Sequence, residues 1–173
     1  MYKAVAIAAF ATSFIAFAST TNDSEHLNKL LADAKTEAAG LQQDASELES
    51  YTRSTMAWQS HAAKLNDMKE HVNKAGQLVQ ELNNGKDQGS TWQQTAINRI
   101  TPALREMADN LEATINSLNK NQGHVNLSTY KNYALANSEL ATDLSQIVGD
   151  FVTYGHAKSK FEKLGERLEV TER

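Results

Sequence analysis

The sequence contains no cysteine. Disulfide bonds, thiol catalysis, thiolate metal sites and covalently attached c-type haem are therefore excluded. Because no covalent cross-link is possible, the stability of the folded chain must come from packing alone. The chain also has only one proline and eight glycines among its 173 residues, and it is rich in residues that favour helices. No segment alternates apolar and polar residues with a period of two, so we predict an all-α protein without a sheet.

Long apolar runs are absent after the first eighteen residues. The one such run is Ala4 to Ala18, and it follows the positively charged Lys3. Ala16 and Ala18 stand before Ser19 in the A-x-A pattern that signal peptidases accept. We therefore predict a signal peptide that is cleaved between Ala18 and Ser19.

Removal of residues 1–18 leaves a mature chain of residues 19–173, a length that suits a single domain. The signal predicts a bacterial protein that is periplasmic or secreted and that meets a membrane only during export. An uncleaved membrane anchor is the alternative. It needs about 20 apolar residues to cross a bilayer, more than the run supplies.

Positive charge is scarce. The chain has 17 Lys and Arg against 21 Asp and Glu. Nucleic acid is therefore not an expected partner, because phosphate binding needs a concentrated basic face. A group of acidic residues near the start of the mature chain is expected to be only a solvated helix face: Glu37, Asp44, Glu47 and Glu49.

Four amphipathic segments fill the mature chain, and they predict helices over residues 23–50, 55–83, 90–120 and 127–169. Short connections between helices of this length favour an up-down-up-down four-helix bundle. The last helix is longer than the others by roughly ten residues, which corresponds to about 15 Å. No Gly or Pro marks the first junction, where we favour a tight turn and keep one kinked rod as the alternative.

The first three predicted helices each carry one apolar seam. In the first helix, for which Asn22 is the expected N-cap, the seam contains only Leu and Ala. Such a seam buries little area per turn, so among the four helices we expect this one to be the most loosely docked or to exchange partners. The three seams are Leu27, Leu31, Ala34, Ala38, Leu41, Ala45 and Leu48; Trp58, His61, Leu65, Met68, Val72, Ala75, Val79 and Leu82; and Ile97, Ile100, Leu104, Met107, Leu111, Thr114 and Leu118.

The last predicted helix carries the heaviest apolar stripe of the mature chain. We expect other helices to cover this stripe, because it contains four aromatic side chains. Asn137, Thr114 and Lys158 interrupt the apolar seams, as single polar residues that fix helix register do. The stripe is Tyr133, Asn137, Leu140, Leu144, Ile147, Phe151, Tyr154, Lys158, Phe161, Gly165 and Leu168.

His61 and Met68 are the only candidates for metal binding. They lie on one seam, and imidazole and thioether are ligands of haem and copper sites. A histidine hydrogen-bonded to a neighbouring helix is the favoured interpretation of His61. The sequence has no Glu-x-x-His, His-Glu-x-x-His, phosphate-binding loop or Gly-x-Ser-x-Gly motif. We therefore predict no catalytic residue, no cofactor and no enzyme activity.

In size and predicted location the mature chain resembles the helical proteins that bacteria export to the periplasm. The periplasmic stress chaperones of the helical-hairpin type are similar in these two respects. Their repeated Leu-Thr-x-x-Gln signature is absent here, so the resemblance assigns no functional residue.

The sequence leads to one principal hypothesis and two alternatives. The first is a non-enzymatic exported bundle that binds a protein partner or itself through its Ala-rich first helix and its projecting last helix. The second is a metal or haem carrier that uses His61 and Met68. The third is reversible binding to a lipid or membrane surface by exposed apolar helix faces.

Overall fold

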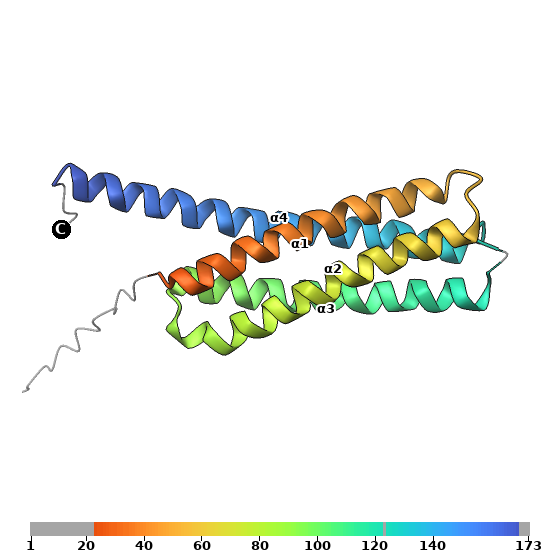
Figure 1. Cartoon of the computed structure of the whole chain (residues 1–173), viewed down its shortest axis with the longest axis horizontal. Helices are drawn as coiled ribbons and strands as arrows, with labels where there is room; N and C mark the ends of the chain where they lie inside the picture. Colours follow the sequence, from red (N-terminus) through yellow and green to blue (C-terminus); the bar gives the residue numbers. More distant parts are fainter. Residues whose placement is uncertain (1–22, 123, 170–173) are drawn as a thin grey trace, which may run out of the picture.

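The computed structural model of the chain describes residues 23–122 and 124–169. The predicted signal peptide, its cleavage site and Asn22 lie outside these residues. The described residues contain no strand and form four α-helices, α1 (Glu25–Tyr51), α2 (Trp58–Gly85), α3 (Thr91–Lys120) and α4 (Ser128–Arg167), with a short 3-10 helix, η1 (Lys86–Gln88), after α2 (Figure 1). The prediction of an all-helical chain with four helices is confirmed.

The helices pack as a bundle in which α1 contacts α2 and α4, and α3 contacts the same two helices (Figure 1). All seven residues of the predicted α1 seam are buried. The expectation that this helix is loosely docked is therefore wrong. Its alanines leave room for two neighbouring helices to approach closely, so that a seam with little bulk is still completely covered.

The predicted seams of α2 and α3 also face the core. Every residue of the α3 seam is buried, and the α2 seam is buried apart from the half-buried Trp58 and Val72. Each of these two helices has one dominant apolar side. The spacing of the apolar residues in the sequence is therefore sufficient to identify the side that is buried.

The buried side of α4 differs from the predicted stripe. Of that stripe only Asn137 and Leu144 are buried, whereas Tyr154 and Phe161 are exposed. Mostly small residues face the bundle instead, because they allow α4 to come close to the alanines of α1. The buried residues of α4 are Tyr130, Ala134, Asn137, Ala141, Leu144, Val148, Val152 and Gly155.

Two helix starts are set by capping residues. Ser24, not Asn22, is the N-cap of α1, and its Oγ accepts a hydrogen bond of 3.4 Å from the backbone N–H of Leu27. At the start of α3, Ser90 and Gln93 form a capping box. Between α1 and α2 the chain forms a turn at residues 52–57, so the two helices are not one kinked rod.

The last helix is the longest, with 40 residues against 27, 28 and 30 in α1, α2 and α3. Figure 1 shows its C-terminal end extending past the first turn of α1. None of the helices among the described residues combines the length and the apolar character needed to cross a membrane.

The close packing of α1 can be tested at Ala45, which is fully buried. We expect Ala45→Leu to lower the free energy of unfolding by about 1–3 kcal/mol, because the larger side chain forces neighbouring helices apart. Ala39→Leu is the matched control, since Ala39 lies on the exposed side of α1. Urea unfolding followed by circular dichroism measures both. Equal stability of the two variants would contradict close packing at the seam.

Candidate functional site

His61 is a buried histidine at the start of α2. Its Nδ1 lies 3.0 Å from the hydroxyl of Tyr130 on α4, and Tyr51 packs edge-on against its ring, with centroids 5.7 Å apart. Burial lowers the pKa of His61 and raises the pKa of Tyr130, so both groups are neutral near pH 7. Within the described residues, His61 Nε2 has no hydrogen-bond partner.

Met68 is also fully buried, but it lies seven residues after His61 on the same helix. That separation corresponds to about 10 Å along the helix axis. It is too large for both side chains to bind the same ion. The described residues contain no group of three or more His, Cys, Asp or Glu that could hold a metal. The metal-carrier alternative stays a prediction, with His61 Nε2 as the atom it would use.

Two polar residues that interrupt the predicted seams contact each other. Asn137 on α4 donates a hydrogen bond of 2.7 Å from Nδ2 to Thr114 Oγ1 on α3, and this hydroxyl donates in turn to the Asn110 carbonyl. Asn137 Oδ1 is buried without a partner among the described residues. A buried polar pair of this kind favours one alignment of two helices, because any shift leaves the Asn137 amide buried without its acceptor.

A cluster of charged side chains joins α1 and α2. Lys64 Nζ lies 2.9 Å from Asp44 Oδ1, 2.9 Å from Glu47 and 3.3 Å from Asp67. Asp44 is only 9% exposed, so the expectation that it belongs to a merely solvated face is wrong. The hydrogen bond with Glu47 is the main reason that the pKa of Lys64 is raised, and Lys64 keeps its positive charge among the three carboxylates.

His71 extends this cluster along α1. Its Nδ1 lies 2.7 Å from Glu37 Oε2 and its Nε2 lies 3.6 Å from Asp44 Oδ2. The ring sits over Gly40, where an added Cβ would be 2.5 Å from His71 Cε1. Glycine at this position therefore makes room for the ring. The cluster holds α1 and α2 together.

A second polar contact ties the start of α1 to the place where α4 leaves the bundle. Asp23 accepts a hydrogen bond of 2.8 Å from Trp92 Nε1 and lies 3.1 Å from Lys158 Nζ. Burial alone would raise the pKa of Asp23, but its hydrogen bonds to Ser90, Trp92 and Lys158 lower it. Trp92 also packs on Gly155, where a Cβ would lie 2.7 Å from the indole ring.

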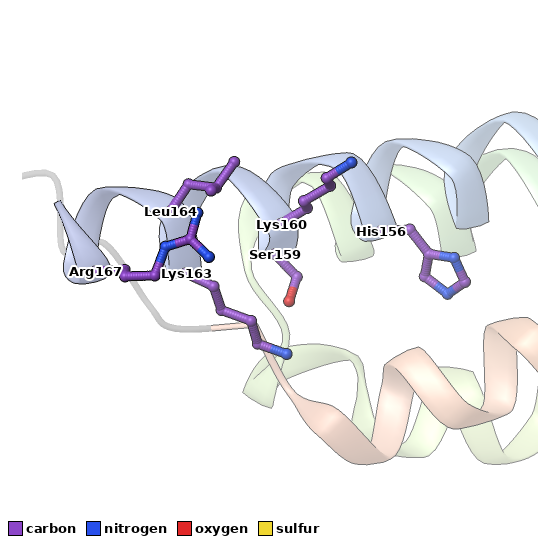
Figure 2. Close-up of a pocket in the computed structure, with 6 residues that line it drawn as sticks. All are labelled: His156, Ser159, Lys160, Lys163, Leu164 and Arg167. Atoms are coloured by element: carbon purple, nitrogen blue, oxygen red, sulfur yellow. The ribbon is translucent and has the colours of Figure 1, made fainter.

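Beyond Gly155, α4 exposes large apolar side chains. Phe161 is 63% exposed and Leu168 is 64% exposed, and Tyr154 just before them is 52% exposed. A hollow of about 610 Å³ lies beside this part of the helix, and Figure 2 shows the side chains that line it. The described lining residues all come from α4: His156, Ser159, Lys160, Lys163, Leu164 and Arg167.

The projecting part of α4 is the candidate functional site. Most charged and polar side chains described above are already paired with one another, whereas Phe161 and Leu168 expose apolar area that costs free energy in water. The sequence predicted that this helix projects. It did not predict the contacts of Lys64, His71 and Asp23, since these partners are distant in the chain and no local pattern links them.

Comparisons of the chain with known protein families, with curated proteins and with solved structures gave no match.

The buried His61 predicts a pH dependence of stability. Because its folded-state pKa is lowered, the unfolded chain takes up a proton on this ring at a higher pH than the folded chain does. The stability contributed by neutral His61 is complete above about pH 6.5, its ordinary pKa, and is lost as the pH falls below that value.

We therefore expect the urea midpoint to fall between pH 7.5 and pH 5, and to fall less in the double variant His61→Leu with Tyr130→Phe. The double variant removes the ring and its hydroxyl partner together, so that neither is left buried and unpaired. Parallel pH profiles of the two proteins would contradict the buried, neutral state of His61.

Proposed function

We propose that the protein is an exported, non-enzymatic helical bundle that acts by binding a protein partner or a second copy of itself. The projecting part of α4 is the binding surface. The observation that carries this proposal is the exposure of Phe161 and of the C-cap residue Leu168 at the end of α4, which extends past the first turn of α1 (Figure 1). The first helix is not part of the surface, since its seam is buried between α2 and α4.

The amphipathic character of this segment supports protein binding. Exposed apolar side chains on one side of a helix are the usual anchors for a partner helix or groove. Lys160, Lys163 and Arg167 lie next to them and would restrict the choice of partner through charge. Gly155 marks the inner limit of the surface, because there α4 still packs closely on Trp92.

The proposal includes an up-down-up-down topology and a single domain over residues 19–173. Contacts at both ends of the bundle support the topology. At one end, the start of α1 meets the start of α3 through a hydrogen bond of 2.9 Å from Gln93 Nε2 to the Ser24 carbonyl. At the other end, Tyr51 at the end of α1 meets His61 at the start of α2 and, through it, Tyr130 at the start of α4.

The binding surface can be tested with Phe161→Glu combined with Leu168→Glu. We expect this double variant to lose at least tenfold in affinity for whatever the natural chain binds, including itself, because two charges replace its apolar anchors. The fold should be unaffected, since both residues are exposed. Light scattering after gel filtration detects self-association, and chemical cross-linking in an envelope extract followed by mass spectrometry detects a partner.

Leu135→Glu provides the matched control, because Leu135 is an exposed leucine of α4 (46%) that lies far from the projecting part in the sequence. It should bind as the natural chain does. If the double variant and the control bind equally well, α4 beyond Gly155 is not the binding surface. If the natural chain neither self-associates nor cross-links, the proposed function is wrong.

The proposed export has a separate test. Expression of the full sequence in a bacterium should give a protein in the periplasm or medium whose first residue is Ser19, as measured by intact mass. Ala18→Phe should block processing, because signal peptidases require a small residue at this position. Recovery of the natural chain with Met1 to Ala18 intact would contradict the cleavage and the proposed location.

Lipid binding is the alternative that one observation favours, since exposed Phe161 and Leu168 accompany Lys160 and Lys163 on a single helix. The negative net charge of the chain, −4, opposes its approach to anionic lipid. Flotation with vesicles that contain anionic lipid distinguishes the two proposals. If the natural chain comigrates with the vesicles and the double variant does not, membrane binding takes the place of protein binding as the proposed function.

A further inference from the structure

Four basic side chains form one row along the projecting part of α4. The steps between them are four, three and four residues, and such steps keep side chains on the same side of a helix. All four are exposed, and together they extend over about 17 Å of helix. We call this set the basic row: His156, Lys160, Lys163 and Arg167.

The basic row also lines the hollow beside α4. The described residues around this hollow of about 610 Å³ are the four of the row together with Ser159 and Leu164. None of these described side chains is a carboxylate. Figure 2 shows Ser159 and Lys163 pointing to the same side of the helix. The hollow therefore offers positive charge and hydrogen-bond donors, and its volume is within the range of about 300–1,000 Å³ that is usual for small-molecule sites.

The charges of the basic row are not balanced by ion pairs within the part of the chain that the structure describes. There, the ion pairs of α4 involve only Lys158, which lies 3.1 Å from Asp23 and 2.6 Å from Glu162. Each step along the row instead places one basic side chain beside the next, which disfavours the helix when both are charged. Since the net charge of the whole chain is −4, the row is a local exception in an acidic protein.

The helix dipole accounts for only part of the basic row. Cations are favourable in the last turn of a helix, and the effect falls off beyond that turn. Arg167 is the last residue of α4, and Lys163 is four residues before it. Lys160 and His156 lie further from the helix end, so the dipole does not compensate for their charge.

We infer that the hollow beside the basic row binds a small ligand that carries two or more phosphate groups. A phosphate accepts several hydrogen bonds at once, which suits the ammonium groups of Lys160 and Lys163 and the planar guanidinium of Arg167. Ser159 adds a hydroxyl donor. Lys160 and Arg167 are about 10 Å apart along the helix axis, so a single phosphate cannot contact both, whereas a chain of phosphates can.

A long polyanion such as nucleic acid does not fit this site. The basic row ends with α4, and the net negative charge of the chain opposes the approach of a polymer that extends beyond the row. Two sources of the same chemistry remain, a free phosphate compound and the headgroup of a lipid. The inference goes beyond the proposed function, because Phe161 and Leu168 are not among the described residues that line the hollow.

Calorimetric titration of the natural chain with tripolyphosphate tests the site. We expect one saturable site, with an affinity that falls as salt is added because the contact is electrostatic. Lys160→Gln combined with Lys163→Gln should lower the affinity about tenfold or more, since two charged phosphate contacts are removed. Inorganic phosphate should bind more weakly than tripolyphosphate, and equal affinities would overturn the requirement for two phosphate groups.

Lys69→Gln combined with Lys74→Gln is the matched control. Both lysines are exposed on α2, so this variant loses the same charge at a different place and should bind tripolyphosphate as the natural chain does. An equal loss of affinity in the two double variants would mean that only the overall charge matters, and it would overturn the site. A natural chain that does not bind tripolyphosphate at low salt overturns it as well.

Vesicles that contain phosphatidic acid distinguish the two sources of phosphate. Binding of tripolyphosphate without flotation on these vesicles assigns a free phosphate compound. Flotation that is abolished both by tripolyphosphate and by Lys160→Gln with Lys163→Gln assigns a lipid headgroup.

Phe161→Ser combined with Leu168→Ser separates this inference from the proposed function. The variant removes the apolar anchors without adding charge, so it should keep its affinity for tripolyphosphate while its binding to a protein partner is lost. If it loses tripolyphosphate binding too, the hollow is not a separate phosphate site. If it keeps both kinds of binding, the proposed function fails and the phosphate site stands.

Discussion

The fold depends on the close approach of helices to the α1 seam. In a chain without cysteine, no cross-link restricts the unfolded state, so dispersion and the burial of apolar surface must supply the stability. The seam of α1 combines four leucines with three alanines, and all its residues are buried. Alanine gives little apolar area of its own, but it lets α2 and α4 come near enough for the leucines to be surrounded. The remaining helices are arranged around this contact.

The same constraint explains the orientation of α4. A helix that faces a seam of alanines packs best with small residues of its own, and α4 accordingly turns Ala134 and Ala141 inward. Its bulky residues Phe151 and Tyr154 lie toward the edges, next to Arg99 and Trp92 respectively. Polar groups then fix the alignment: Asn137 pairs with Thr114, and Asp44 with Lys64, across helices that apolar contacts alone would allow to slide.

The sequence was most informative where a helix has a single apolar side. The buried sides of α1, α2 and α3 follow from residue spacing, because in each of them one row of Leu, Ile, Val or Met stands out. In α4 two rows compete, one heavy and one small, and a ranking by bulk chose the wrong one. The projecting length of α4 was predictable from its pattern. The partners of Lys64 and His71 were not, since a salt bridge between helices depends on their relative rotation, which no local spacing reveals.

The contact of Gly155 with Trp92 divides α4 into two parts of unequal local stability. Before it, opening the helix would expose core residues such as Val148 and Val152, so backbone amides there exchange with solvent only when the bundle opens. After it, the last turns bury almost nothing and can fray while the bundle remains intact. An occupant that covers Phe161 and Leu168 would therefore order these turns. Through the contact of Lys158 with Asp23 it would also restrain the beginning of α1. Binding at the C-terminal end of α4 would therefore affect the N-terminal end of α1.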